Sequence, residues 1–285
     1  MRKNYLAIVL LLGCCFADHA RATTVVYIVT PTGIVIGADG KTIPSGTAMK
    51  IFLLKRRLVV ADSYTESAKV SGGTTTLYDF PTWIEVIDSK IRSNTTVEAL
   101  SLIIKDEMPR SFSFAIEGIK SGAIKKSDPG VEDILIRYIV AGYESGIPTI
   151  YSIWFGIDWD QKTVIGPQRV LVQPEQRQRA DSRFGAFGQH VALNQLGDTQ
   201  SDVHKKAVAK LPLEYQTLAA GKDLTLKQAS NFVRGLLAIE AVANPQNVGF
   251  PITVVTIPKV GHGWFRTYER DVPALSQLPK GARNK

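Results

Sequence analysis

The order of apolar segments along the chain limits the folds open to it more than any other sequence feature. Short runs rich in β-branched residues come first, followed by two helical segments, more strand-like runs, a second helical region and a last strand. Strands that bury one face need a second layer, and helices with one apolar stripe need a sheet or another helix. The order therefore predicts an α+β fold with two sheets between helix layers.

Turn residues and periodicity define the individual elements. Pro31 and Gly33 lie between the first two apolar runs, which predicts a β-hairpin, and a second hairpin follows it. Segment 111–129 has no clear pattern. The predicted strands are 24–30, 34–39, 50–54, 58–61, 134–143, 149–155, 169–172 and 252–257, and the predicted helices are 80–91, 97–107, 191–220 with breaks at Gly197 and Pro212, and 226–243.

Composition is that of an ordinary globular protein, with 45% apolar and 21% charged residues among 285. The net charge of +8 is spread thinly, and its densest spots are Arg177 with Arg179 and Lys205 with Lys206. No long basic run is present, so we do not expect a nucleic-acid partner. One domain is predicted over residues 23–270, followed by a poorly ordered tail over 271–285.

The first 22 residues have the pattern of a secretory signal peptide. A positive start, Met1–Asn4, precedes an apolar stretch, Tyr5–Ala17, which is shorter than the about 20 residues that a membrane span needs. Small residues flank Arg21 at Ala20 and Ala22, as signal peptidase requires. We therefore expect an exported protein, periplasmic or secreted, whose mature chain begins at Thr23.

A second processing route stays open at this stage. Leu11-Leu12-Gly13-Cys14 is a passable lipoprotein box, and cleavage there would leave an acylated Cys14 as a membrane anchor. Without that lipid we expect no stable anchor. Both cysteines, Cys14 and Cys15, lie in the leader, so the mature chain can form neither disulfides nor thiolate metal sites. The mature histidines are scattered, and we expect no metal and no cofactor.

The start of the mature chain resembles that of a proteasome β-subunit or its bacterial relative. The resemblance rests on Thr23-Thr-Val-Val-Tyr-Ile-Val and Gly33-Ile-Val-Ile-Gly-Ala-Asp39, in which Asp39 is the seventeenth residue counted from Thr23. Lys50, in Ala48-Met49-Lys50-Ile51-Phe52, matches the family's lysine, and segment 139–151 resembles its central hairpin. The resemblance implies an N-terminal-nucleophile (Ntn) hydrolase with a four-layer αββα sandwich.

The chemistry of the three matched residues is consistent with that family. A Thr hydroxyl needs an adjacent base, and a free α-amino group with a pKa of ~7.7–8.0 can accept its proton near neutral pH. Only a terminal Thr carries both groups. The resemblance implies that Thr23 is the nucleophile, that Lys50 keeps its amine neutral and stabilises negative charge, and that Asp39 orients Lys50.

The residues expected to support this site depart from the family pattern. Gly188 falls where the family has its glycine–serine turn, but Gln189 follows it where the family often has a Ser. Asn244 and Asn247 stand where the family often has an Asp and a Ser near the last loop. Where the family has a Gly-rich turn whose backbone N–H serves the oxyanion, this chain has Asp62-Ser63-Tyr64. These departures fit a divergent enzyme or one that is losing activity.

The resemblance predicts hydrolysis of a peptide or amide substrate through a Thr23 acyl-enzyme. Two alternatives remain open from the sequence: a catalytically inactive sandwich that serves as a binding or assembly module, and a small-molecule amidase with the same nucleophile. Members of the family commonly form rings, so a homo-oligomer is an expected option, although the sequence identifies no ring interface.

Overall fold

A computed structural model describes residues 23–41, 49–62, 67–70, 73–76, 80–111, 113–127, 134–173, 183–188 and 192–270. The predicted leader, residues 1–22, and the predicted tail, residues 271–285, lie outside these ranges. In the described parts of the chain, six α-helices and a short 3-10 helix accompany two five-stranded antiparallel sheets and a small two-stranded one. The fold class is therefore α+β, as predicted.

The first sheet carries both ends of the predicted domain. Its strand order is β10-β1-β2-β11-β12, and every neighbouring pair is antiparallel. Its strands are β1 (Thr24–Thr30), β2 (Gly33–Asp39), β10 (Arg183–Gly188), β11 (Ile252–Pro258) and β12 (Trp264–Tyr268). Every residue of β1 and β2 is buried, which places these two strands at the centre of the molecule with other elements on both faces.

The second sheet has the order β3-β4-β7-β8-β9 and is also antiparallel. A two-residue turn with positive φ at Ser145 (50°) and Gly146 (78°) joins β7 to β8, as tight hairpins prefer. The strands are β3 (Ile51–Leu54), β4 (Leu58–Asp62), β7 (Ile134–Glu144), β8 (Ile147–Asp158) and β9 (Thr163–Gln173), and the small sheet pairs β5 (Ser67–Val70) with β6 (Gly73–Thr76).

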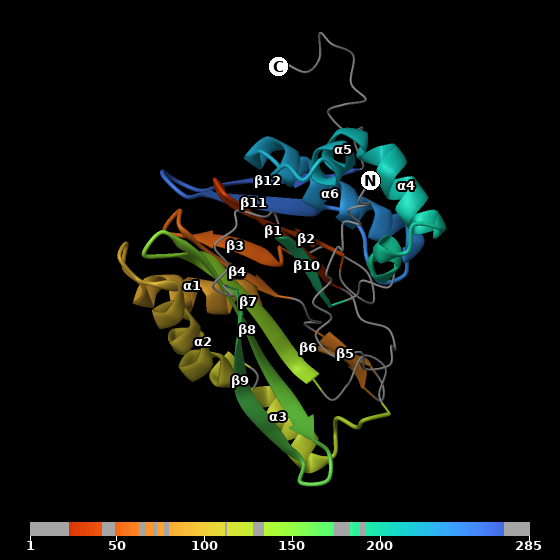
Figure 1. Ribbon diagram of the computed structural model, residues 1–285. Coiled ribbons are helices and arrows are strands. Elements are labelled where there is room, and N and C mark those ends of the chain that lie inside the picture. Colours follow the sequence, from red (N-terminus) through yellow and green to blue (C-terminus); the bar gives the residue numbers. More distant parts are fainter. Residues whose placement is uncertain are drawn as a thin grey trace.

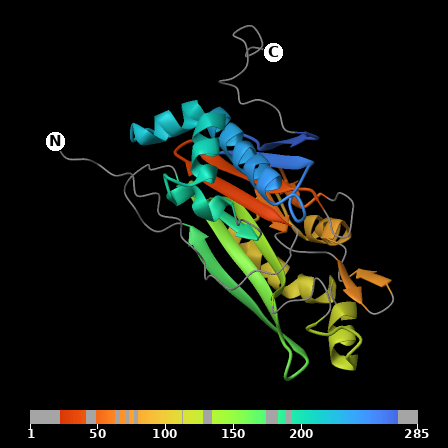
Figure 2. The same cartoon turned by 90° about the vertical axis from the view of Figure 1, so that its right-hand side faces the viewer.

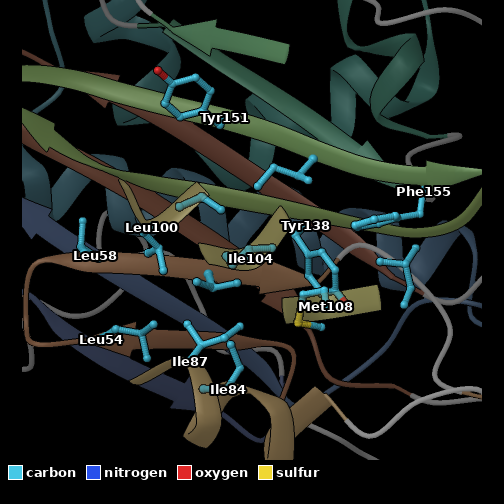
Figure 3. Close-up of a cluster of buried hydrophobic side chains, with 14 of the residues drawn as sticks. Leu54, Leu58, Ile84, Ile87, Leu100, Ile104, Met108, Tyr138, Tyr151 and Phe155 are labelled. Carbon is cyan, nitrogen blue, oxygen red and sulfur yellow. The ribbon is translucent and has the colours of Figure 1, made fainter. Parts of the chain in front are cut away.

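Each large sheet carries helices on one face (Figure 1; Figure 2, the view turned by 90°). Helices α1 (Phe80–Lys90), α2 (Val97–Ser111) and α3 (Ser113–Ser121) pack on the second sheet. Figure 3 shows Ile104 and Met108 of α2 beside Tyr138 of that sheet. The first sheet is covered by η1 (Leu193–Gly197), α4 (Asp202–Lys210), α5 (Pro212–Ala219) and α6 (Leu226–Ala243).

A third apolar core lies between the two large sheets. Val25, Ile34 and Ile36 of the first sheet share it with Val59 and Ile139 of the second. This core covers one face of β1 and β2, and the helices cover the other, so these strands lack the apolar–polar alternation of a sheet with one face in water. The two sheets therefore pack face to face, with helices on their outer faces.

Helix α6 is the most deeply buried helix of the described chain. Thr225 caps its first turn through a capping box with Gln228, in which each side chain bonds the other residue's backbone N–H. Twelve of its residues are buried. Its Val233 and Leu237 lie against Gly37 of β2 and leave no room for a side chain at that position. The prediction of a helix over 226–243 is confirmed.

Several expectations from the sequence need correction. The second helix continues beyond residue 107 to Ser111, through Pro109, and the unassigned segment 111–129 contains α3. Strands β5, β6, β10 and β12 were not predicted, although β10 and β12 form the two edges of the first sheet, and β9 (Thr163–Gln173) extends well beyond the predicted strand 169–172. The predicted helical region 191–220 consists of η1, α4 and α5, with the breaks near Gly197 and Pro212 where they were expected.

Candidate active site

Thr23 directly precedes β1, the second strand of the first sheet. Its exposed fraction is 1% in the chain with the first 22 residues attached, where its nitrogen is a peptide nitrogen and not an amine. In the strand register the next residue, Thr24, lies opposite Gly188, which ends β10 with a left-handed φ of 74°. Glycine adopts this left-handed conformation without the steric cost that a side chain would add, which explains why residue 188 is a glycine.

Asp39 ends β2 and points its carboxylate at three backbone N–H groups. Its Oδ1 accepts a hydrogen bond from the N–H of Thr24 at 2.6 Å. Its Oδ2 accepts from the N–H of Lys41 at 3.2 Å and from that of Gly249 at 3.3 Å. A carboxylate that accepts several backbone N–H bonds is held in one orientation, and Asp39 therefore joins β1 to the loop before β11.

Lys50 directly precedes β3 and faces Asp39 from the second sheet. Its Nζ lies 3.7 Å from Oδ2 of Asp39, and both side chains are buried, with exposed fractions of 2% and 0%. The Lys50 ammonium also donates to the carbonyl oxygen of Lys41. A buried ammonium needs a countercharge and acceptors, and this site provides both. Burial raises the pKa of Asp39, while the Lys50 ammonium and the three N–H groups act in the opposite direction.

The structure thus brings together the three residues that the sequence singled out. The N–H bound by Asp39 belongs to the peptide bond between Thr23 and Thr24, so Thr23 lies one peptide unit from the Asp39–Lys50 pair. Residues from β1, β2 and the start of β3 meet here because the two sheets face each other at this point. The catalytic roles of the three residues stay predictions.

Two residues of this site were missed by sequence reasoning. Lys41 contacts it through three atoms: its N–H binds Asp39, its carbonyl accepts from Lys50, and its Nζ donates to the carbonyl of Pro245. Gly249 contributes an N–H to Asp39. Aspartate side chains often bind the N–H two residues on, so the Asp39–Lys41 contact had a local signal. The Gly249 contact spans 210 residues and had none.

The predicted supporting residues have different outcomes. Gly188 lies directly opposite Thr24 on the neighbouring strand, whereas Gln189 lies outside the described residues. The side chains of Asn247 and Asn244 bond each other, Nδ2 to Oδ1 at 3.1 Å, and so shape the loop that carries Gly249. Strand β4 ends at Asp62, and the rest of the turn expected to bind an oxyanion, Ser63 and Tyr64, lies outside the described residues.

The described residues show neither a cluster of metal ligands nor a membrane-spanning helix. Over the parts of the chain that the structure describes, no three His, Asp or Glu side chains gather as metal ligands. None of the described helices combines the length and the apolar character needed to cross a membrane.

The chain was compared with known proteins. It matches no family model and no curated protein. Among solved structures it is similar to Anbu (ancestral beta-subunit) from Yersinia bercovieri, with a TM-score of 0.47 and 14% sequence identity over 87% of this chain and 88% of that one. At this identity and TM-score the likeness says nothing about activity, so function has to be inferred from the geometry around Thr23.

Proposed function

We propose that this chain is an exported, proteasome-like N-terminal threonine hydrolase that cleaves peptide or amide bonds once residues 1–22 are removed. The observation that carries the proposal is the buried Asp39 carboxylate, which binds the N–H after Thr23 on one side and the Lys50 ammonium on the other. A charged pair is costly to bury, and burying it beside the first residue of the mature chain fits a catalytic role.

The fold supports the same assignment. Two facing antiparallel sheets share a core, and each carries helices on its outer face. This arrangement supports the four-layer αββα sandwich implied by the resemblance to Ntn hydrolases. Because a fold by itself does not specify a reaction, the proposal depends on the site.

The proposed reaction begins when cleavage after Ala22 converts the Thr23 peptide nitrogen into an amine. The amine accepts the hydroxyl proton as Oγ1 attacks the substrate carbonyl, whose π electrons move to oxygen. The tetrahedral intermediate collapses, the C–N bond breaks, and the proton passes from the Thr23 ammonium to the leaving nitrogen. Water, deprotonated by the same amine, then hydrolyses the ester and releases the acid.

Lys50 and Asp39 act on the protonation state of this amine. A fixed ammonium nearby disfavours a second positive charge, so Lys50 lowers the pKa of the Thr23 amine toward neutral pH. Asp39 holds Lys50 in place and balances its charge. An amine with a pKa near the working pH is an efficient general base.

The test is covalent labelling of the exported, processed protein with a β-lactone or an epoxyketone. Mass spectrometry should find one adduct, on Thr23. Thr23→Ala should remove the adduct, whereas Thr24→Ala should retain it. Thr24 is the matched control because it is an adjacent, equally buried Thr whose backbone N–H, not its side chain, binds Asp39.

Other outcomes point to the alternatives. A correctly processed protein that forms no adduct with any of several electrophile classes would refute the enzyme and favour the inactive binding or assembly module. An acylated Cys14 would leave Thr23 inside the chain and refute the mechanism. An adduct together with turnover of small amides, but not of peptides, would identify the amidase.

A further inference from the structure

Helix α6 buries a carboxylate that has no part in the mechanism above. Glu240 lies one turn before the end of α6 and is fully buried. Its Oε1 accepts the N–H of Ala192 at 3.3 Å, and its Oε2 accepts the N–H of Leu193 at 3.0 Å. A buried carboxylate is unfavourable unless its lone pairs are used, and here it binds two consecutive backbone N–H groups.

Those N–H groups lie shortly after the strand that flanks Thr23. Ala192 follows Gly188 by four residues, a stretch of chain that spans at most about 14 Å. Gly188 ends β10 opposite Thr24, next to Thr23. Fixing the N–H groups of Ala192 and Leu193 therefore limits where the end of β10 can lie relative to Thr23.

The last turn of α6 is also bonded to the start of the loop that carries Gly249. The N–H of Asn244 donates to the carbonyl oxygen of Glu240 at 2.7 Å and closes the helix. The loop that begins at Asn244 supplies the Gly249 N–H to Asp39. The last turn of α6 is thus bonded to two chain segments that border the site, one through the Glu240 side chain and one through its backbone.

We propose that Glu240 is a positioning residue for Thr23 chemistry, which sets the place of the end of β10 beside the nucleophile. This inference rests on the proposed function. Glu240 acts through the two backbone N–H groups that it binds, so its loss should slow bond formation while leaving Thr23 able to react. A displacement of about 1 Å in a catalytic site can slow a reaction about 100-fold.

A purely structural role predicts a different result. The N–H groups of Ala192 and Leu193 open η1, and a carboxylate there also stabilises that short helix. If this were its whole effect, removing the charge would lower thermal stability without changing the reactivity of the folded protein. The two roles therefore separate when labelling rate and stability are measured on the same variants.

The chain contains a matched control for this substitution. Glu214 of α5 is also a fully buried carboxylate, and its Oε1 accepts from the Asn231 side chain of α6 at 2.6 Å. Asn231 and Glu240 are nine residues apart on α6, which is about 13 Å along the helix axis. Glu214→Gln therefore makes the same chemical change under the same helix, away from the segments that border Thr23.

The experiment measures the rate constant of Thr23 labelling by a β-lactone, and its dependence on probe concentration, in processed protein. Glu240→Gln should lower the maximal rate at least about tenfold, with little change in the half-saturating probe concentration. Glu214→Gln should label at the wild-type rate. Glu240→Asp, which keeps both acceptor oxygens, should recover part of the rate.

Equal maximal rates for wild type and Glu240→Gln would overturn the inference while leaving the proposed function intact. Wild-type protein that does not label refutes the proposed function, and the inference with it. If Glu240→Gln fails to fold, the maximal labelling rates of Glu240→Asp and Glu214→Asp are compared instead. Equal rates in that pair would overturn the inference as well.

Discussion

Replacing Asp39 with Asn is the most direct perturbation of the candidate site, because the change is nearly isosteric and removes one charge. The carboxylate accepts three backbone N–H bonds through two oxygens, and it faces Lys50 at 3.7 Å. An amide has one acceptor oxygen, and its NH₂ group would meet at least one of those N–H donors. The variant also leaves the buried Lys50 ammonium without this carboxylate.

The expected magnitude follows from these contacts. An unsatisfied buried N–H costs about 1–3 kcal/mol, and removing one partner of a buried ion pair costs about 3–5 kcal/mol in total. We therefore expect Asp39→Asn to lower the free energy of unfolding by about 3–5 kcal/mol. For a domain of this size that loss is a fall in Tm of about 6–20 °C.

Lys50→Met provides the comparison that tests the reasoning. It removes the other charge but leaves all three N–H bonds to Asp39, and burial already favours the neutral form of that carboxyl. The expected loss is about 1–3 kcal/mol, smaller than that of Asp39→Asn. The double variant should lose less than the two single losses combined, by at least about 1 kcal/mol.

The assay is urea unfolding of processed protein, followed by circular dichroism and tryptophan fluorescence. Coincident transitions would justify a two-state free energy. Equal losses for Asp39→Asn and Lys50→Met, or additive losses in the double variant, would refute the view that Asp39 organises the site through its backbone contacts. Both single variants should also lose Thr23 labelling while folded.

Three further predictions concern packing, pH and processing. Gly37→Ala places a Cβ 2.7 Å from two side chains of α6 and should lower the free energy of unfolding, measured in urea, by about 1–3 kcal/mol. Gly197→Ala has open space around the new Cβ and should change that free energy by no more than about 0.5 kcal/mol. Burial raises the pKa of Asp39, and the carboxyl is protonated below its pKa, so acidification should lower the labelling rate first through protonation of the Thr23 amine and then more steeply as Asp39 takes up its own proton; a slope of one throughout would contradict this. Ala22→Phe removes the small residue that signal peptidase needs, so intact mass should show an uncleaved chain without a Thr23 adduct, and a labelled, uncleaved chain would be the contrary result.

Local pattern was enough to predict the elements whose apolar residues are continuous or periodic. The hairpin of β1 and β2, the hairpin of β3 and β4, and helix α6 were found within one or two residues because burial is encoded in their own sequences. The resemblance to the proteasome family singled out Asp39 and Lys50, whose side chains the fold places 3.7 Å apart. These signals lie within about thirty residues of sequence or in one helix face.

Two of the missed strands, β10 and β12, depend on partners elsewhere in the chain. β12 is an edge strand whose residues are exposed or half-buried, so no apolar alternation marks it. β10 contains Gly185, whose Cβ position lies 2.6 Å from the ring of Tyr27, so packing against β1 demands a residue with low strand preference. In α2, the burial of Met108 holds the last turn despite Pro109, which tertiary packing can do and a local rule cannot foresee.

The backbone contact of Asp39 has a consequence for the timing of activation. The carboxylate binds the N–H of the second mature residue and not the nitrogen of the first, so the Asp39–Lys50 pair is already formed in the uncleaved chain. In the proposed enzyme the precursor is therefore a zymogen in which the Asp39–Lys50 pair exists before the Thr23 amine does. Activation of this pair then requires one hydrolysed peptide bond, and the compartment where residues 1–22 are removed is the compartment where activity begins.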